Sequence, residues 1–586
     1  MKNLKRKNLK RKALKRHLIR AACVGLIFGL LGQGGPAEAA RTYGLDPRVD
    51  SLGEITGSSL IRRIQESLRA IGFYTGPVDG QANELLREAI RQYQKRTGLE
   101  VDGRATEALA SRLETGQKIE DLLERLRESR EEKMQQAREA LAANPETARL
   151  IDPNRAPDKA DPTRDVEGCF AEPTPACLLF EASESSKIVS RRDMRDWALG
   201  ELLIAQTRAG LDGEAMTTAA RIADPRLIIV ALTDIAQHQA RTGRMAAALD
   251  ASRLIPDPLR KADALFTVAR LKLMAGSDIQ DLVDRLTVTL STLPDDIETL
   301  RRQLALASLE IQAGLNGKER IATLQGAATA LEDEGERRDR LRLIAGALAE
   351  TGETDAARTL YEAIGLDESD IALRLTTANL NGAGSGGATI ETADAIQAGR
   401  YRAVALARIA ESRARAGEEA SAREALERAA ATVEEITLSY ATSYARARIA
   451  QAQLALADLT GEIDEALAAM EAIKDPALRA TELWRLVGYL TLKGETERAR
   501  AITTLAETTS DKIISRVSRV WVHADFSEAM MRHNQTALAQ SAFERGLAVA
   551  RTIKNPWGRT RALARLAQAL STLHREALPD QEGSSK

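Results

Sequence analysis

The sequence predicts an all-α protein, and three observations lead to that fold class. The chain of 586 residues is 3% aromatic and rich in Ala, Leu and Arg, a composition that favours helices over strands. Apolar residues recur at helical spacing along most of the chain. Beyond residue 178, turn glycines recur about every 35 residues, a period typical of stacked helix pairs. We therefore predict a small three-helix module, a linker and an αα solenoid.

Residues 1–39 have the three parts of a secretory signal peptide. Ten of the first forty residues are Lys or Arg, the uncharged core Ala21–Leu31 follows, and Ala37-Glu38-Ala39 forms an A-x-A cleavage signal. As a helix the core would be roughly 16 Å long, too short for the ~30 Å hydrocarbon layer of a membrane. We predict cleavage before Ala40, export to the periplasm and no membrane contact afterwards. An uncleaved N-terminal anchor is the alternative.

The net charge of the predicted mature chain argues against nucleic acid as a partner. Removing the ten basic residues and the single acid of the first forty leaves 73 basic and 83 acidic residues, a net charge of −10. Such a chain has no bulk electrostatic attraction for a phosphate backbone.

Two cysteines remain after the predicted signal peptide. Cys169 and Cys177 stand close together in GCFAEPTPACLLFE. An isolated pair in an oxidising compartment predicts a disulfide. A redox or thiol site is the less favoured alternative, because there is no C-x-x-C spacing and no adjacent His.

Residues 58–114 form a compact pattern of three short helices. Glycines at 72 and 98 stop the first two helices, and Asp79-Gly80 and Asp102-Gly103 mark turns. The unit of about 55 residues is near the lower limit for independent stability.

The order of residues in this segment carries a resemblance. It runs Ile64-Gln65, Leu68, Ile71-Gly72-Phe73-Tyr74, Gly76, Val78-Asp79-Gly80, Ala89-Ile90, Tyr93-Gln94, Gly98-Leu99 and Asp102-Gly103. In this it resembles the peptidoglycan-binding domain type 1 family, which implies a non-catalytic module that holds an exported protein on the cell wall. The family usually has an aromatic-Gly pair after the first Asp-Gly and a Thr three residues later, where this chain has Ala82, Asn83 and Leu86.

Wall peptides and amino sugars offer amides, hydroxyls and carboxylates to such a module. Aromatic rings, a turn and an arginine could bind them. The candidate contacts are Phe73, Tyr74, Asp79, Arg91 and Gln94. Each also has a structural alternative: aromatic rings can fill the core, aspartates can cap their own turns, and Gln65 and Gln94 can tie loops to helices.

Between the module and the solenoid we expect two further segments. Residues 115–143 are predicted to form a charged helix, either a solvated spacer or a short dimeric coiled coil. Residues 144–177 are predicted to be a linker that includes the disulfide loop. At the other end of the chain, residues 576–586 are predicted to be a disordered tail.

Residues 178–575 show the repeat. The predicted turn glycines are Gly210, Gly243, Gly276, Gly314, Gly352, Gly382, Gly417, Gly461 and Gly494. Alanines recur seven residues before several of these glycines and five residues after others, which favours close packing of facing helices. Asp-Pro or Asn-Pro pairs at 224, 257, 475 and 555 suit the starts of helices.

The array is similar to the tetratricopeptide family, and ten or eleven helix pairs are expected. Most of that family's signature is missing, notably its Trp and Tyr positions, so other αα solenoids remain open. Such arrays curve and expose a long concave surface that binds extended peptides or proteins. Four tryptophans are either partner anchors or, as we favour, inter-repeat packing: Trp197, Trp484, Trp521 and Trp557.

The sequence carries no recognisable catalytic motif. H-E-x-x-H and G-x-S-x-G are absent. His523, Asp525, Glu528 and His533 cluster, but on one helix the two histidines would be about 15 Å apart, too far to share a metal. We therefore expect no enzyme activity, no catalytic residues, no metal and no cofactor.

Our hypothesis is a periplasmic, wall-associated scaffold or adaptor. It would bind peptidoglycan through residues 58–114 and recruit unidentified envelope proteins through the helical repeats. The alternatives are a wall hydrolase or amidase activator with an unrecognised site, and a scaffold for envelope assembly or secretion.

Overall fold

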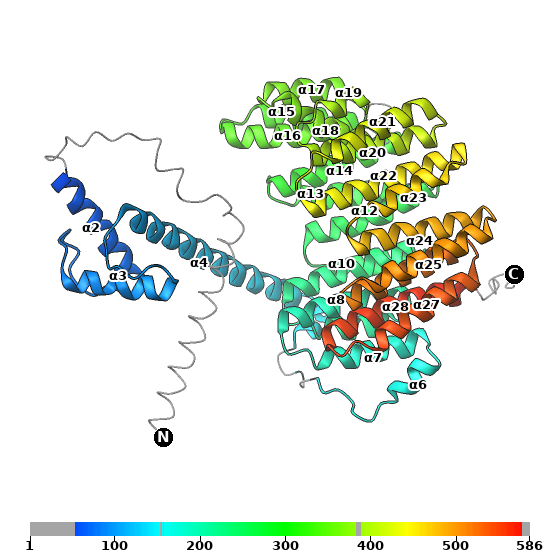
Figure 1. The fold of residues 1–586 in the computed structure, drawn as a ribbon, viewed down its shortest axis with the longest axis horizontal. Coiled ribbons are helices and arrows are strands. Elements are labelled where there is room, and N and C mark those ends of the chain that lie inside the picture. The colour runs from blue at the N-terminus through cyan, green and yellow to red at the C-terminus, as the bar shows by residue number, and fades with distance from the viewer. Residues whose placement is uncertain (1–52, 153–154, 156–157, 382–387, 577–586) are drawn as a thin grey trace. The chain divides into compact units, whose positions relative to one another are not determined.

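The computed structural model describes residues 53–152, 155, 158–381 and 388–576 (Figure 1). Within these residues it contains 27 α-helices, one 3-10 helix and no strand, so the predicted all-α class is confirmed. The chain divides into two compact units between Glu132 and Lys133. The predicted signal peptide, the tail beyond residue 576 and the turn glycine at 382 lie outside the described residues.

The first unit contains the predicted N-terminal module. Its helices are α2 (Gly53–Ala70), α3 (Glu84–Thr97) and the start of α4 (Glu107–Ala142). One apolar cluster holds them together, with Ile64, Leu68, Leu86, Ile90 and Leu113 almost completely buried. Asn83 caps the start of α3 and Gly98 ends it in the left-handed conformation.

Helix α4 joins two elements that the sequence analysis separates. The third helix of the module and the charged helix predicted at 115–143 form one continuous helix of 36 residues. Gly116 lies inside it, where nothing lies within 4 Å of an added β-carbon, and a single glycine weakens a helix without ending it. Leu122 and Leu126 are each 57% exposed on its solvated part.

The segment 144–177 is more ordered than a linker. It contains α5 (Pro145–Ala148), the 3-10 helix η2 (Arg149–Ile151) and α6 (Val166–Ala171). Leu150 and Phe170 are buried in the main core of the second unit, and the Asp161 N–H donates to the Glu184 carboxylate at 2.7 Å. Two isolated apolar residues among prolines and charges give no periodic signal, which is why the sequence does not indicate this packing.

The predicted disulfide is present. Cys169 and Cys177 are bonded, with α-carbons 5.8 Å apart. The bond joins α6 to the first turn of α7 (Pro175–Lys187) and closes a short loop.

Ten consecutive helix pairs follow α7. The first helices are α8 (Arg192–Arg208), α10 (Pro225–Arg241), α12 (Pro258–Met274), α14 (Ile297–Gln312), α16 (Glu334–Glu350), α18 (Glu368–Asn381), α20 (Gly399–Arg415), α22 (Ser439–Thr460), α24 (Pro476–Leu492) and α26 (Arg516–Met531). The second helices are α9 (Asp212–Ala219), α11 (Met245–Arg253), α13 (Gln280–Ser291), α15 (Gly317–Thr329), α17 (Thr354–Ala363), α19 (Ile390–Asp394), α21 (Glu419–Val433), α23 (Ile463–Glu471), α25 (Thr496–Asp511) and α27 (Thr536–Arg551). The last helix is α28 (Pro556–Glu576).

The turn chemistry inside the pairs follows the sequence pattern. Every predicted turn glycine within the described residues has a positive φ, between 71° and 90°. In the pair α26/α27 the same position is Asn534, whose φ is 56°. Asparagine tolerates this region better than other side chains, so the repeat continues where the glycine spacing stops.

Small residues hold the paired helices close together. Ala236, Ala307 and Ala410, each seven residues before a turn glycine, are completely buried. Ala248 and Ala422, each five residues after one, are also completely buried. At the starts of α10, α12 and α24 the side chains of the aspartates at 224, 257 and 475 accept backbone N–H groups, as predicted.

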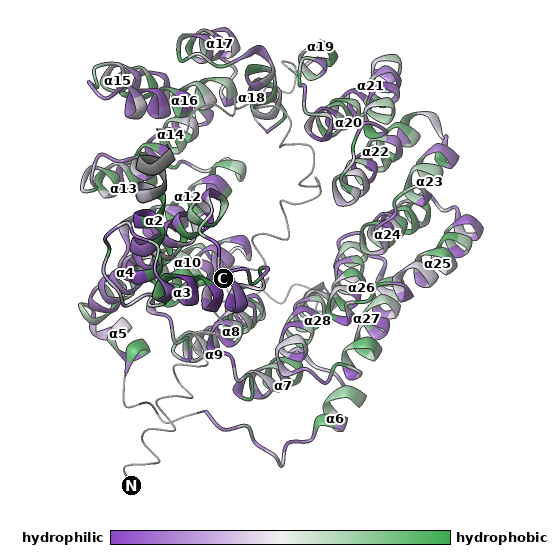
Figure 2. Ribbon diagram, turned by 60° about the vertical axis from the view of Figure 1, so that its left-hand side comes forward, coloured by the Kyte–Doolittle hydropathy of each residue, from purple (hydrophilic) through white to green (hydrophobic). Residues whose placement is uncertain are grey.

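The two ends of the array meet. Helix α28 packs against α7 and α8, and Figure 2 shows the first helices of the pairs on the inner side of a closed ring. α7 lies beside α28 on the outer side and completes an eleventh pair with it. We call residues 175–576 the helical ring, and the contact of α7 and α8 with α28 the seam. The sequence predicts a curved array with a concave surface, and its closure into a ring is a finding of the structure.

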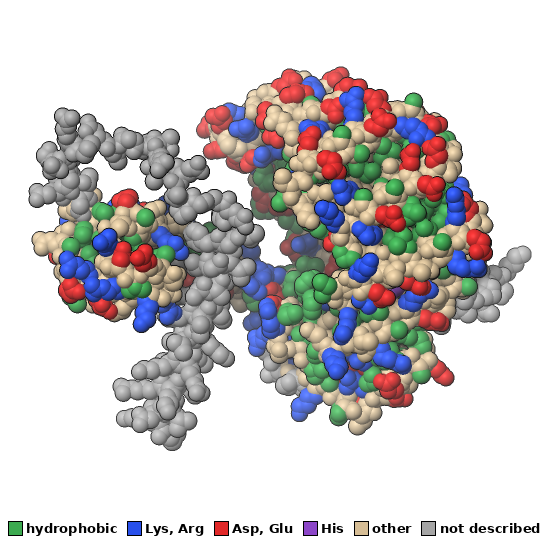
Figure 3. Space-filling view, in the orientation of Figure 1, with side chains coloured by type: hydrophobic (Ala, Val, Ile, Leu, Met, Phe, Trp, Pro, Cys, Tyr) green, Lys and Arg blue, Asp and Glu red, His purple; other side chains and the backbone are tan. Residues whose placement is uncertain are grey.

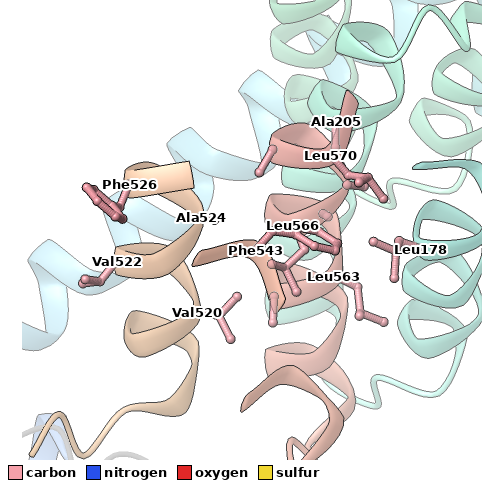
Figure 4. Packing of buried hydrophobic residues seen from close by; sticks show 14 of the residues in the cluster. Leu178, Ala205, Val520, Val522, Ala524, Phe526, Phe543, Leu563, Leu566 and Leu570 are labelled. Carbon is pink, nitrogen blue, oxygen red and sulfur yellow. The ribbon is translucent and has the colours of Figure 1, made fainter. Parts of the chain in front are cut away.

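The seam is an apolar core with a polar edge. Leu563, Leu566 and Leu570 of α28 point toward Leu178 of α7 and Ala205 of α8 (Figure 4). Beside them the Thr560 hydroxyl donates to the Ala182 carbonyl at 3.2 Å, and Arg208 Nη1 donates to Gln568 Oε1 at 2.7 Å. The ends of the solenoid therefore bury each other's apolar faces.

Three of the four tryptophans lie at the seam. Arg561 of α28 donates through Nε to both carboxylate oxygens of Glu201, at 2.9 and 2.8 Å. Its guanidinium lies 4.6 Å from the ring centres of Trp197 and Trp557 and 5.1 Å from that of Trp521. These cation–π contacts join helices from the two ends of the array.

The fourth tryptophan is internal to the repeats. Trp484 is 1% exposed and donates its indole N–H to Ser510 at 3.0 Å. Trp197, by contrast, keeps 55% of its surface exposed. The favoured interpretation of the tryptophans as packing residues therefore describes Trp484 fully and Trp197 only in part.

No helix in the described part of the chain is long and apolar enough to span a bilayer.

Substituting Arg561→Ala should loosen the seam. The change removes three cation–π contacts and leaves the mostly buried Glu201 without its cation, so we expect the ring to lose about 3 kcal/mol of stability. Thermal melting measures the loss, and small-angle scattering measures whether the ring opens. Arg253→Ala, on the exposed face of α11, is the control and should change neither. An unchanged melting temperature for Arg561→Ala would contradict the role of the seam.

Candidate functional site

The N-terminal module contains the same turn twice. Val78-Asp79-Gly80-Gln81-Ala82-Asn83 precedes α3, and Val101-Asp102-Gly103-Arg104-Ala105-Thr106 precedes α4. Each turn contains an Asp-Gly pair with glycine at positive φ, and the last side chain of each accepts an N–H from the first turn of the next helix. A glutamine from a preceding helix holds each turn.

Gln65 of α2 holds the first turn. Its amide Nε2 donates to Asp79 Oδ1 at 2.9 Å and to the Gln81 carbonyl at 3.0 Å, and its Oε1 accepts the Gly80 N–H at 2.8 Å. Gln65 is completely buried, so these bonds satisfy an amide that has no water.

Gln94 of α3 holds the second turn in the same way. Its Nε2 donates to Asp102 Oδ1 at 2.7 Å, and its Oε1 accepts the N–H groups of Asp102 and Gly103 at 3.1 and 2.9 Å. The side-chain amide thus replaces backbone partners that the turn does not supply.

Hydrogen bonds lower the pKa of both turn aspartates below its ordinary value. The pKa of Asp79 is lowered mainly by the Gln65 amide and then by the Gln81 N–H. The pKa of Asp102 is lowered mainly by the Arg104 N–H and then by the Gln94 amide. Hydrogen bonds to the charged form are the common cause.

The glycine of the first turn is required for two reasons. Gly80 has a φ of 75°, and a β-carbon there would lie 2.8 Å from the backbone oxygen of Ser58. Backbone cannot move aside as a flexible side chain can, so any larger residue would force α2 and the turn apart.

Two of the five candidate contacts lie in the interior. Tyr74 is 2% exposed, and its hydroxyl donates to the Pro77 carbonyl at 2.9 Å and accepts from Asn83 Nδ2 at 3.2 Å. Gln94 is 6% exposed and holds its turn. The structure favours the structural alternative for these two residues.

The other three candidates reach the surface. Asp79 is exposed, Phe73 is half-buried with its ring edge-on to Tyr93 at 5.7 Å, and Arg91 is half-buried and paired with Glu84 at 3.3 Å. A β-carbon on Gly103 would lie 3.0 Å from Arg91 Nε, so this arginine lies across the second turn. The structure therefore associates Asp79 with the first turn and Arg91 with the second.

Two exposed apolar residues near these turns are absent from the sequence-based candidates. Leu85, in the first turn of α3, is 63% exposed, and Val101, just before the second Asp-Gly, is 51% exposed. Exposed aliphatic groups beside polar turns suit the methyl and acetyl groups of wall polymers. Leu85 could have been found from the sequence because it falls outside the helical spacing of Leu86, Ala89 and Ile90.

Comparison with known proteins agrees with this geometry. Residues 57–113 match a family model described as "Putative peptidoglycan binding domain". The match covers the three helix segments and both Asp-Gly turns of the module. No curated protein matches the chain.

The cluster HADFSEAMMRH does not converge on one site. Asp525 and Glu528 on α26 both accept from Arg565 of α28, at 2.6 and 2.7 Å. His523 is 4% exposed and lies edge-on to Trp484 at 5.7 Å, while His533 is exposed. The carboxylates are therefore part of the ion pairs between α26 and α28, and His523 belongs to the core.

Gln94→Leu should destabilise the module, because it leaves the Asp102 and Gly103 N–H groups without their acceptor, while the Asp102 carboxylate loses one donor and keeps the Arg104 N–H. We expect a loss of about 3 kcal/mol. Hydrogen exchange of residues 58–114, followed by mass spectrometry, measures it separately from the ring. Gln92→Leu is the matched control, since that amide bonds only to Glu88 on the exposed face of α3. Equal protection of residues 58–114 from hydrogen exchange in the two variants would contradict the role of Gln94 in holding the second turn.

His523 should make the ring less stable in acid. Burial, and next Arg545 and Arg519, lower its pKa from 6.5 to about 4. Between these values the unfolded chain binds more protons than the folded one, so stability falls as pH drops from 6.5 to 4, by about 3 kcal/mol in total. Denaturant titrations at several pH values should show a shallower fall for His523→Gln than for wild type. His533→Gln, at an exposed site, should follow wild type; an unchanged slope for His523→Gln would contradict the assignment.

Proposed function

We propose that this protein is an exported scaffold that binds peptidoglycan through residues 57–113 and recruits other envelope proteins through its helical ring. The observation that carries the proposal is the match of residues 57–113 to the peptidoglycan-binding family model. In the same segment, a buried glutamine holds each of the two Asp-Gly turns. Rigid turns can present Asp79, Arg91 and the neighbouring apolar side chains in fixed positions to a polymeric ligand.

Two features support a place outside the cytoplasm. The Cys169–Cys177 disulfide is stable in an oxidising compartment, and peptidoglycan is itself extracytoplasmic. The signal peptide expected at residues 1–39 agrees with both. The periplasm is the compartment that we propose.

The ring offers surfaces suited to protein partners. Tyr401 at the start of α20 and Tyr440 and Tyr444 at the start of α22 are 44%, 69% and 44% exposed, and Leu438 beside them is 57% exposed. α20 and α22 pack against each other, so these side chains belong to neighbouring helix ends. Tyrosines are enriched at interfaces because they combine apolar area with a hydroxyl. We propose this tyrosine group as a partner contact.

We further propose that the protein acts by binding and has no reaction of its own. The two carboxylates of the HADFSEAMMRH cluster, Asp525 and Glu528, are held by Arg565. Burial alone would raise the pKa of Glu528, but the hydrogen bond and charge of Arg565 hold it below its ordinary value, which makes this carboxylate a poor general acid.

Full-length protein should co-sediment with isolated sacculi, and Gly80→Val should not. Valine at this position would meet the Ser58 carbonyl and cannot adopt the positive φ easily, so the first turn is lost while the ring stays folded. Gel analysis of pellet and supernatant measures binding, and the melting transition of the ring confirms its integrity.

Gly98→Asn is the matched control. Gly98 also has a positive φ, but nothing lies within 4 Å of a β-carbon there, and asparagine tolerates the conformation. This variant should pellet like wild type. Wild-type protein that remains in the supernatant would overturn wall binding, and fragments released from sacculi by the protein alone would overturn the non-catalytic role.

A further inference from the structure

The helical ring contains a pocket of about 920 Å³ along four successive first helices. α12, α14, α16 and α18 follow one another along the inner side of the ring (Figure 2). Their side chains line most of the pocket, and Tyr361 of α17 adds to it. The volume lies in the range of small-ligand sites, which is unlike the flat surface of a protein–protein interface.

The lining is rich in arginine. Arg270, Arg301, Arg342 and Arg374, one from each of the four helices, face two carboxylates, those of Asp339 and Glu350. We call this site the arginine pocket. A cationic pocket contrasts with the predicted mature chain, whose net charge is −10. The local field therefore favours an anionic ligand.

Two of these arginines lack the partners that inner-helix arginines usually have. Elsewhere in the ring Arg302 pairs with Asp263, Arg448 with Glu411, and Arg561 with Glu201. Within the described residues, neither Arg270 nor Arg374 has an ion pair or a side-chain hydrogen bond. The Arg374 Nε atom is buried without an acceptor, and its guanidinium lies 5.9 Å from the Tyr361 ring centre.

The other two arginines are only weakly neutralised. Arg342 pairs with Asp339, one helical turn away on α16, and Arg301 lies 3.7 Å from Glu298. Both are exposed pairs within single helices, which contribute little and exchange readily for a better acceptor. All four guanidiniums can therefore turn toward a ligand.

Small residues leave the space open. Ala305 and Ser308 of α14 and Gly346 of α16 line the pocket where longer side chains would fill it. A β-carbon on Gly346 would meet only the Tyr361 hydroxyl, at an ordinary contact distance of 3.6 Å. A longer side chain at this position would extend into the pocket and leave the core behind it undisturbed.

We propose that the arginine pocket binds the peptide part of soluble peptidoglycan fragments, a short peptide that carries several carboxylates and an amine. The proposal rests on the proposed function, because wall binding places this chemistry beside the protein. Guanidiniums bind carboxylates bidentately, Gln312 and Ser308 can pair with peptide amides, and Glu350 can accept the amine. The module would thus bind polymeric peptidoglycan, and the ring would bind its soluble fragments.

Calorimetry with the full-length protein tests the assignment. The probes are N-acetylglucosaminyl-N-acetylmuramyl-tetrapeptide, the same disaccharide without peptide, and hexaglutamate. We expect the tetrapeptide form to bind and the bare disaccharide not to bind. Arg270→Gln combined with Arg374→Gln should weaken binding by about ten-fold or more, since two charge-assisted contacts are lost. Gly346→Leu should weaken it similarly with no change of charge.

The control makes the same charge change elsewhere. Arg253 and Arg285 lie on the exposed faces of α11 and α13. The double variant Arg253→Gln, Arg285→Gln should therefore bind the tetrapeptide form like wild type. Wild-type affinity in both pocket variants, or no binding by wild type, would overturn the proposal. Tighter binding of hexaglutamate, lost in the same variants, would overturn it in favour of an acidic segment of a protein partner.

Sacculus sedimentation separates this inference from the proposed function. The pocket variants should still pellet with sacculi, because their module is unchanged. Failure of wild type to pellet, with tetrapeptide binding retained, would refute the wall-bound scaffold and leave the pocket assignment standing. Normal pelleting with no effect of the pocket variants on tetrapeptide binding would refute the pocket alone.

Discussion

The contact between the two ends of the helix array determines the closed architecture of the second unit. A solenoid exposes an apolar face at each end, and open arrays need polar capping repeats to cover it. Here α28 covers the start of the array and α7 covers its end, so each end caps the other. Mutual capping requires that helices far apart in the chain align at the seam. The Arg561–Glu201 ion pair and the tryptophans around it hold them in that alignment.

Closure also changes what the inner surface can do. An open array can flex along its length, whereas in a ring each first helix is held by neighbours on both sides. Pockets between such helices therefore keep their shape, because the backbone that lines them is held on both sides. The segment 144–177 adds contacts at the seam, because Phe170 lies beside the guanidiniums of Arg551 and Arg559 while the disulfide joins α6 to α7.

The N-terminal module reaches rigidity by other means. It is too small to depend on apolar burial alone, and two buried glutamines replace the missing backbone partners of its Asp-Gly turns. The repetition of this device leaves the outward side chains of both turns in fixed positions. The module and the ring thus share one property: the backbone that carries the candidate ligand-binding side chains is held in place before a ligand arrives.

The sequence by itself determined the fold class, the repeated helix pairs with their turn glycines and aspartate caps, the buried alanines, the disulfide pair and the resemblance of the module. These features depend on residues within a few positions of one another, so periodicity and turn chemistry reveal them. Among the binding candidates it correctly located the turns, but it could not tell the buried Tyr74 from the accessible Asp79. Only the tertiary structure decided the ring closure, the packing of segment 144–177 and the arginine pocket. The physical reason is distance along the chain: the seam bond of Arg208 to Gln568 joins residues 360 apart, and the angle added by each helix pair determines whether such residues meet.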